Sequence, residues 1–175
     1  GGANPLNKTK FREVLREGAL AFGKSRQNSE RDKIPVAEDA EELAVAMDKW
    51  NQLGSLGGGN HFCELQVDDE GKVWVMIHTG SRGFGYRTAE NYFELGAAAL
   101  GLTKGQKDLV WCDAASTMGR AYWNHHNMAA NFAIANRFLI GAVVCRALED
   151  TFGGTAEIFY EISHNLIQEE GGDGI

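Results

Sequence analysis

Helical spacing of apolar residues accounts for most of the chain. It predicts an amphipathic helix over residues 8–23, stopped by a glycine, and a second helix over about 37–50. Further along, the same spacing predicts a helix over about 87–100 and a long helix over about 116–151. At about 1.5 Å per residue, the long helix would span on the order of 50 Å unless it breaks at Gly141.

Extended segments alternate with these helices. Residues 62–67 alternate between apolar and polar side chains, which predicts a strand, and residues 68–71 predict a hairpin turn. The return strand over 73–77 is apolar throughout, so we expect it to lie centrally in a sheet. Residues 157–162 predict a third strand. The fold class is therefore α+β, and residues 1–175 form one domain because no repeat or linker divides them.

Composition places the chain among ordinary globular proteins. Its 175 residues are 43% hydrophobic and 23% charged, which excludes a disordered tail, a collagen-like repeat and a disulfide-dense miniprotein. A net charge of −7 argues against a broad basic surface for duplex nucleic acid. Residues 1–35 alone carry eight basic side chains against four acidic ones. A solvated helix face explains this excess better than a local site for an acidic polymer, and both interpretations stay open.

Cysteine usage and the length of apolar runs bear on the compartment. The three cysteines are widely spaced and form no C-x-x-C pair, which favours a reducing compartment. No amino-terminal segment has the signal-peptide pattern, and the longest apolar run, 138–145, is far shorter than the roughly 20 residues that cross a bilayer. We therefore expect a soluble cytoplasmic chain with no membrane partner. Because it starts at Gly1 and stops soon after a Gly-Gly-Asp-Gly stretch, we interpret it as a piece of something larger.

Three histidines mark the ends of the predicted strands. His61 stands where one strand begins, whereas His78 and His164 stand where strands end. Neutral imidazole is the commonest metal ligand, and rigid strand ends let side chains converge on an ion. A single histidine of this kind is more often a structural residue with satisfied hydrogen bonds. The neighbours of each histidine therefore carry the argument.

Glycines and polar side chains surround these histidines. Three consecutive glycines precede Asn60, and such glycines let backbone N–H groups approach an anion, while Glu64 adds a carboxylate. After His78, the residues Ser81 and Arg82 stand between glycines next to a predicted helix N-terminus, a layout that suits phosphate. The loop is neither a Walker A motif nor G-x-G-x-x-G. A flexible hairpin lead-in and a tight strand-to-helix turn are the structural alternatives.

Other polar residues fit structural roles at least as well. His125 and His126 are adjacent on the long helix and point about 100° apart, so they cannot chelate one ion together. As a free cysteine within an apolar alternation, Cys63 is expected in the core rather than as a ligand. A polar stripe on the long helix fits a polar cleft, and it fits a solvent-exposed or helix-packing face at least as well. The stripe consists of Arg120, Asn124, Asn127 and Asn131.

Three sequence blocks resemble signatures of the RtcB family of RNA ligases, in the same order. They are residues 53–65 (LGSLGGGNHFCEL), 78–83 (HTGSRG) and 163–165 (SHN), and Asn136-Arg137 in the long helix also fits. The resemblance covers the chain from about residue 10 to its end. The glutamate-rich end resembles the bacterial branch of the family that is found beside a release-factor homologue.

The resemblance implies an RtcB-like fold in which strands with glycine-rich loops, packed by long helices, form a metal and nucleotide site. It implies GTP- and Mn²⁺-dependent joining of an RNA 3′-phosphate or 2′,3′-cyclic phosphate end to a 5′-hydroxyl end, in RNA repair or tRNA splicing. In that family a histidine is guanylylated before GMP passes to the RNA. The implied partners are therefore RNA ends and GTP, and the implied cofactors are two Mn²⁺ ions that polarise phosphoryl oxygens.

The resemblance also implies roles for individual residues. His61 would bind one Mn²⁺ ion, and His78 and His164 would bind the second. Ser81 and Arg82 would contact the surroundings of the nucleotide or an RNA phosphate. The nucleotide-binding residues would be Asn60, His61, Phe62, Cys63, Glu64, His164 and Asn165.

Two family motifs have no counterpart in this sequence. The Asp and bridging Cys of a Gly-Cys-Gly type motif are missing, as is the nucleophilic histidine of a His-Gly-Ala-Gly type motif. We therefore predict a central fragment that does not ligate RNA alone. Two alternatives stay open: a metallohydrolase in which the three histidines hold one Zn²⁺, and a noncatalytic nucleotide- or RNA-binding protein. Strict alternation also puts His61 on the strand face opposite Asn60 and Glu64. A bulge or an irregular strand start after the glycines would bring them together.

Overall fold

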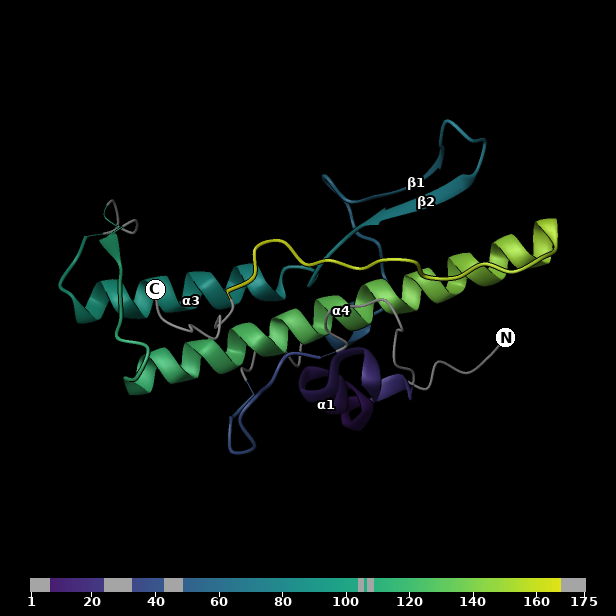
Figure 1. The fold of residues 1–175 in the computed structure, drawn as a ribbon. Helices are drawn as coiled ribbons and strands as arrows, with labels where there is room; N and C mark the ends of the chain where they lie inside the picture. Colours follow the sequence, from purple (N-terminus) through teal and green to yellow (C-terminus); the bar gives the residue numbers. More distant parts are fainter. Residues whose placement is uncertain (1–6, 24–32, 43–48, 104–105, 107–108, 168–175) are drawn as a thin grey trace, which may run out of the picture.

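The fold is organised along one long helix, α4 (Thr117–Phe152), against which the other elements are arranged (Figure 1). The computed structural model describes residues 7–23, 33–42, 49–103, 106 and 109–167. The elements that precede α4 are α1 (Lys8–Glu17), the 3₁₀ helices η1 (Gly18–Phe22) and η2 (Trp50–Gln52), β1 (Phe62–Val67), β2 (Val73–His78) and α3 (Phe84–Ala99).

The hydrophobic core lies where α1 and η1 pack against the middle of α4. Asn7 caps α1 by accepting the N–H of Lys10 at 2.8 Å, and the apolar spacing of the helix turns Phe11 inward. The Phe11 ring meets the Phe132 ring of α4 edge-on, with centroids 5.8 Å apart. The buried members of this cluster are Phe11, Val14, Leu15, Ala21, Leu53, Phe84, Met128, Ala129, Phe132 and Ala135.

Three of the predicted helices are confirmed with small shifts. The segment predicted over 8–23 is α-helical to Glu17, then tightens into η1 and ends at Gly23, whose φ of 70° favours glycine. Helix α3 begins earlier than predicted because Gly83, with φ of 82°, turns the chain directly into the helix. Helix α4 runs without a break through Gly141.

The polar stripe of α4 is a packing face. The buried Asn131 side chain accepts the N–H of Ile34 at 2.7 Å and donates to the carbonyls of Ile34 and Leu15 at 2.9 and 3.0 Å. Asn127, also buried, donates to the carbonyl of Pro35 at 2.8 Å. These amides satisfy backbone groups of an irregular segment that passes over α4. The packing-face interpretation is therefore confirmed, and the polar-cleft interpretation is not.

Strands β1 and β2 pair antiparallel in a hairpin that projects away from the helices (Figure 1). The register runs from Phe62 opposite His78 to Val67 opposite Val73, as a short turn requires. The predicted hairpin is therefore confirmed. Its open end, where Phe62 faces His78, lies next to the helices.

A carboxylate holds the hairpin turn. Asp68 accepts the indole N–H of Trp74 and the backbone N–H of Lys72, both at 2.8 Å, and the N–H of Glu70 at 3.0 Å. The hydrogen bond from Trp74, followed by those from the backbone, lowers the pKa of Asp68. The polar turn residues therefore fix the geometry that their sequence predicts.

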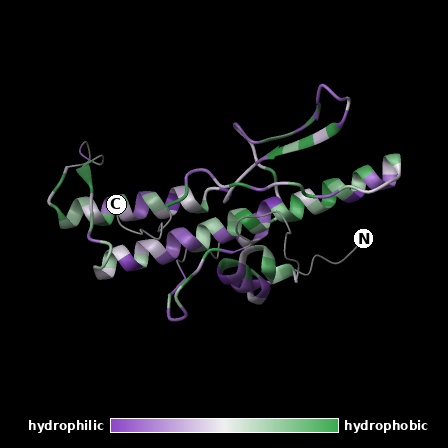
Figure 2. Ribbon diagram, viewed as in Figure 1, coloured by the Kyte–Doolittle hydropathy of each residue, from purple (hydrophilic) through white to green (hydrophobic). Residues whose placement is uncertain are grey.

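The predictions of a third strand and of a central β2 are wrong. Within the described part of the chain, the sheet consists of β1 and β2 alone. Residues 157–162 are extended but run back along α4, where Phe159 meets Trp74 with ring centroids 5.3 Å apart. A Cβ at Gly141 would lie 2.9 Å from Ile158, so this glycine lets the segment lie close to the helix. Side-chain packing on α4 takes the place of a strand ladder, and β2 keeps exposed apolar residues (Figure 2).

The predicted helix over 37–50 is wrong in its first part. Residues 37–42 are irregular, and η2 forms only at Trp50–Gln52. Residues 43–48 of this prediction lie outside the described residues, as do residues 24–32 of the basic region and the glutamate-rich end after 167. The first turn of the predicted helix gives way because its backbone binds other elements: the N–H of Ala37 donates to Asn124, and the carbonyls of Ala37 and Ala40 accept from Arg16.

Basic residues of the first two described segments pair with nearby acids. All of these ion pairs lie at the surface, where each contributes little to stability. Their arrangement agrees with the solvated-face interpretation of the amino-terminal charge. The pairs are Lys10–Glu13, Arg12–Glu42 and Lys33–Glu17, at 2.8, 2.9 and 2.8 Å.

By length and composition alone, α4 could cross a membrane. More than half of its most apolar stretch is, however, buried inside the protein, as in the core helix of a globular fold. Its fully buried polar side chains, Asn127, Asn131 and Asn136, bind backbone groups of other segments. In this structure α4 therefore serves as the core helix.

Replacement of Asn131 by alanine is expected to lower the free energy of unfolding by roughly 2–4 kcal/mol, because it leaves buried backbone groups of Ile34 and Leu15 unpaired. Urea unfolding followed by circular dichroism measures the change. The matched control Asn124→Ala removes an amide from the same stripe at a more exposed position, where we expect a loss below about 1 kcal/mol. Equal losses for the two variants would contradict the packing role of Asn131.

Candidate functional site

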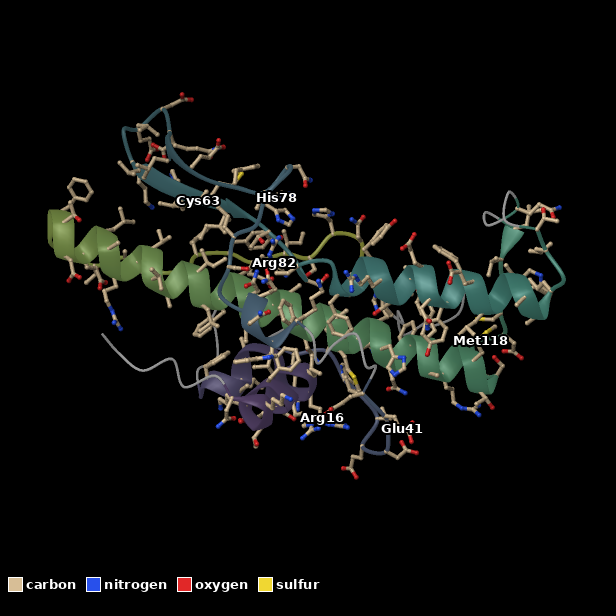
Figure 3. All side chains as sticks on the ribbon, turned by 180° about the vertical axis from the view of Figure 1, so that it is seen from behind. Arg16, Glu41, Cys63, His78, Arg82 and Met118 are labelled. Carbon is tan, nitrogen blue, oxygen red and sulfur yellow. The ribbon has the colours of Figure 1, made fainter. Side chains whose placement is uncertain are left out.

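The three histidines singled out in the sequence lie close together. The ring centroids of His61 and His78 are 5.9 Å apart, and those of His78 and His164 are 5.5 Å apart. They come from the loop before β1, the end of β2 and the extended segment after α4. Figure 3 shows His78 and Arg82 at the base of the hairpin, beside the helices. The predicted gathering is present, and the role of these histidines as ligands stays a prediction.

The start of β1 explains how His61 reaches His78. The strand begins at Phe62, so Asn60 and His61 precede it and escape its alternation. Gly59, with φ of 72°, turns the chain at this point. As a result, Asn60 Nδ2 lies 3.4 Å from His78 Nε2, and the Phe62 ring lies 5.4 Å from the His78 ring. The irregular strand start that we considered beside a bulge is therefore the feature that brings these side chains to one place.

The spacing of the rings suits shared divalent cations. Two imidazoles that ligate one ion at about 2.1 Å have centroids roughly 5–6 Å apart, and the pairs His61–His78 and His78–His164 have this spacing. Among the residues that the structure describes, no three His, Cys, Asp or Glu side chains form a ready-made metal site. The three imidazoles could therefore supply only part of a ligand set for a divalent cation.

Arg82 occupies the position next to His61. Its Nη1 lies 2.8 Å from His61 Nδ1, and its Nε donates to Ser55 Oγ at 3.1 Å. A Cβ at Gly57 would lie 1.8 Å from Nη1, so the guanidinium fits only because residue 57 is glycine. Arg82 itself has φ of 55°, in the left-handed region. The glycine-rich loop before β1 thus forms a seat for the guanidinium.

Ser81 caps helix α3. Its Oγ accepts the N–H of Gly85 at 2.9 Å, and its carbonyl accepts the N–H of Phe84 at 3.0 Å. The loop is therefore the tight strand-to-helix turn that we listed as the structural alternative. A contact of Ser81 and Arg82 with phosphate stays a prediction that this turn permits, because the hydroxyl and the guanidinium lie at a helix N-terminus.

A buried asparagine of α4 joins two of the loops. Asn136 Oδ1 accepts the N–H groups of Gly54 and Ser55 at 2.7 and 3.1 Å. Its Nδ2 donates to the carbonyls of Ser55 and Gly80, both at 3.1 Å. Gly80 is two residues from His78, and Ser55 binds Arg82. One side chain therefore fixes the loops before β1 and after β2 relative to each other.

Arg137, the next residue, fixes the extended segment after α4, which carries His164. Its Nη1 donates to the carbonyl of Thr79 at 3.1 Å, and its Nη2 donates to Ser163 Oγ at 2.6 Å. Its Nε donates to Glu161 at 2.6 Å in an ion pair that is mostly buried. Thr79 and Ser163 adjoin His78 and His164. Asn136 and Arg137 matched the family pattern, but their role as the support of the site could not be derived from sequence; a polar pair within an apolar helix was the available signal.

The remaining predicted nucleotide-site residues lie in different settings. Cys63 is exposed on the hairpin (Figure 3), so the prediction that it lies in the core is wrong. Among the described residues, no second layer covers strand β1. Glu64 is also exposed and accepts a hydrogen bond from Gln66 at 2.6 Å. Asn165 follows His164 with a left-handed φ of 54°. Their contacts with a nucleotide stay predictions.

The two helical histidines lie outside this cluster, as expected. His125 Nδ1 is 2.7 Å from the Tyr92 hydroxyl, and its Nε2 is 2.8 Å from the carbonyl of Glu41. His126 Nε2 instead accepts the N–H of Ile167 at 3.2 Å. The neighbours thus bind different elements, so no ion joins them.

Burial and charge lower the pKa of His61. Desolvation contributes most, and the positive charge of Arg82 comes next. A backbone hydrogen bond with Leu56 acts in the opposite direction, and His78 adds a smaller lowering effect. The neutral imidazole is therefore favoured, which is the form that can bind a metal ion.

Comparison with known proteins agrees with the sequence blocks. The family model described as tRNA-splicing ligase RtcB matches residues 2–174. The chain is 33% identical to a tRNA-splicing ligase RtcB of Thermococcus kodakarensis, over 94% of this chain and 41% of that protein. It is 36% identical to a tRNA-splicing ligase RtcB of Pyrobaculum aerophilum, over 94% of this chain and 40% of that protein. It is 35% identical to an RNA-splicing ligase RtcB of Mycobacterium tuberculosis, over 68% of this chain and 32% of that protein.

The family model and these three relatives are all described as tRNA- or RNA-splicing ligases. The match over nearly the whole length of the chain shows that the chain belongs to the RtcB family. The chain spans about two fifths of the length of the archaeal relatives named above.

Removal of the Arg137 guanidinium tests the support of the site. Arg137→Met leaves Glu161 charged in a mostly buried place, and we expect it to lower the free energy of unfolding by about 3–5 kcal/mol. The double variant Arg137→Met/Glu161→Gln removes that charge and should recover part of the loss. Urea unfolding of both variants measures the difference. A loss below about 1 kcal/mol for the single variant would show that the pair does not hold the segment.

The setting of His61 also predicts a pH dependence. Its folded-state pKa lies below the ordinary 6.5, so the folded state binds fewer protons than the unfolded one as the pH falls through this range. The contribution of His61 to stability is thus present above pH 6.5 and lost as the pH falls through its lowered pKa. NMR titration of the imidazole should give a pKa below 6.5 that rises in Arg82→Met. A pKa unchanged by that substitution would contradict the influence of the guanidinium.

Proposed function

We propose that this chain supplies part of the active site of a GTP- and Mn²⁺-dependent ligase that joins RNA 3′-phosphate or 2′,3′-cyclic phosphate ends to 5′-hydroxyl ends. The observation that carries the proposal is the meeting of His61, His78 and His164 from three separate segments. Membership of the RtcB family supports the RNA-ligase part of the proposal. The physiological role would be RNA repair or tRNA splicing.

The histidines are the residues that would hold Mn²⁺. His61 would serve one ion. His78 and His164, whose ring centroids lie 5.5 Å apart, would serve a second. Divalent ions bound there would polarise phosphoryl oxygens. Neutral imidazoles are acceptable ligands for Mn²⁺, particularly with oxygen ligands that a phosphate provides. The lowered pKa of His61 keeps that imidazole in its binding form at neutral pH.

The groups around the histidines would bind the guanine nucleotide. Asn60 presents its amide beside His78, and Phe62 presents an aromatic face at the same place. Cys63 and Glu64 follow on the exposed strand, His164 lies beside His78, and Asn165 is the next residue. The partly exposed Phe62 ring could stack with a base, while amide and carboxylate groups hydrogen-bond to its edge.

The turn after β2 would bind phosphate. The Arg82 guanidinium can form paired hydrogen bonds with phosphate oxygens, and the N-terminus of α3 adds a favourable dipole. Ser81 already caps the helix through its oxygen, so its hydroxyl hydrogen is the group left to donate. These groups would act on a nucleotide phosphate or on the phosphate of an RNA end.

We further propose a cytoplasmic location and activity that needs more than these residues. All three cysteines lie among the described residues and are free thiols, which supports a reducing compartment. The archaeal relatives are more than twice as long as the segment they share with this chain. We therefore expect the 175 residues alone not to ligate RNA.

Substitution of the clustered histidines tests the proposal. The chain is placed in a full-length protein of its family and incubated with Mn²⁺, labelled GTP and RNA carrying 3′-phosphate and 5′-hydroxyl ends. His61→Gln, His78→Gln and His164→Gln should each lower the rate of joining at least about 100-fold, because each removes a ligand. His125→Gln is the matched control: it lies outside the cluster, and glutamine can keep its hydrogen bonds to Tyr92 and Glu41.

Other outcomes distinguish the alternatives. One tightly held Zn²⁺ with hydrolysis and no joining would favour the metallohydrolase. GTP binding without a guanylylated histidine, even in the full-length protein, would favour a noncatalytic role. Joining of RNA by residues 1–175 alone would contradict the proposed dependence on further segments.

A further inference from the structure

The contact between Arg82 and His61 bears on how a metal ion enters the site. A guanidinium has only N–H donors, so at 2.8 Å from His61 Nδ1 it must donate to the lone pair of that nitrogen. A neutral imidazole with an acceptor at Nδ1 carries its hydrogen on Nε2. In this arrangement neither nitrogen of His61 has a lone pair available for a metal ion.

Both routes to coordination break this contact. A metal ion at Nδ1 would bind the lone pair that now accepts the hydrogen bond from Arg82. A metal ion at Nε2 moves the ring hydrogen to Nδ1, where N–H would face N–H at 2.8 Å. Two donors at that distance repel each other, so the guanidinium must leave in either case.

The position of Arg82 is built into the loop before β1. Ser55 Oγ accepts from Arg82 Nε, and the missing side chain of Gly57 leaves the space for Nη1. Ser55 is in turn held by Asn136 of the core helix. The seat is therefore fixed by the fold and does not depend on the His61 contact.

We propose that Arg82 reversibly blocks the metal site, and we call its guanidinium the plug. Its hydrogen bond to His61 and coordination of a divalent cation by His61 exclude each other. This inference rests on the proposed metal role of His61. Entry of the cation displaces one positive charge by another and releases a guanidinium beside it. The freed guanidinium can then bind an anion that also ligates the cation. Metal loading and phosphate binding would thus use the same side chain in sequence.

Metal affinity tests the plug, and it is measured on a purified full-length protein of the family that carries this chain. The probe is Mn²⁺, titrated and followed by the loss of the electron paramagnetic resonance signal of the free ion. Arg82→Met removes the competing hydrogen bond and should tighten Mn²⁺ binding about tenfold. Arg87→Met is the matched control, because it removes an equal charge from an exposed position five residues along the chain, on α3. We expect the control to change the affinity less than about twofold.

A second measurement follows the plug directly. Long-range ¹H–¹⁵N spectra of the metal-free chain should show His61 with hydrogen on Nε2 and an acceptor at Nδ1. The diamagnetic ion Zn²⁺ should change that pattern and shift the Arg82 Nε–H signal together with it. In Arg82→Met the His61 signals should no longer show the Nδ1 acceptor bond.

The possible results separate the plug from the metal site. Equal Mn²⁺ affinity in wild type and Arg82→Met, with His61→Gln binding weakly, would overturn the plug and leave the proposed metal site standing. Absence of Mn²⁺ binding in every variant would overturn both. Tighter binding in Arg82→Met that disappears in His61→Gln/Arg82→Met would support the plug.

Discussion

The candidate site depends on one buried side chain, the amide of Asn136. The loops before β1 and after β2 are irregular, so many of their backbone groups need partners from other elements. Asn136 supplies two acceptor and two donor interactions to these loops from a fixed position in the core helix. An aliphatic side chain in the same place would leave several buried polar groups unpaired. Asn136 thus fixes the loops relative to the rigid helix α4.

Arg137 has the same function for the extended segment after α4, which lies outside the sheet. Its planar guanidinium binds Thr79 next to His78, Ser163 next to His164, and the buried carboxylate of Glu161. The opposite charge of Glu161 is needed because an unpaired guanidinium at this depth would be costly. Two adjacent residues of one helix therefore hold all three histidine-bearing segments. Because both contacts end on residues beside the histidines, the imidazoles keep their nitrogens for other partners.

Local patterns predicted the elements whose cause is local. The hairpin over 62–78 follows from alternation and the Asp68 turn, and α1 and α4 follow from helical spacing and caps. The failures share a different cause. Residues 157–162 have the pattern of a strand, but packing of Ile158 on Gly141 and of Phe159 on Trp74 decides their place. Cys63 and β2 have the pattern of a core, yet Cys63 is exposed and β2 is covered only in part, by the extended segment that carries Phe159. The sequence also predicted that the histidines lie close together. The contact between Arg82 and His61 could be seen only in the structure, because it depends on the space that Gly57 leaves.

The charges of the cluster favour a cation that is held together with a phosphate. The three imidazoles are uncharged when they can bind a metal, and Glu161 is neutralised by Arg137. Among the described contacts of His61, the charged partner is the positive Arg82. A divalent cation alone would therefore enter a site with positive rather than negative potential, and Coulomb repulsion would oppose it. A nucleotide or RNA phosphate would reverse this balance, because its oxygens would ligate the cation and would also give Arg82 a partner in place of His61. The electrostatics thus favour a site that is completed by its phosphate ligand rather than by protein groups alone.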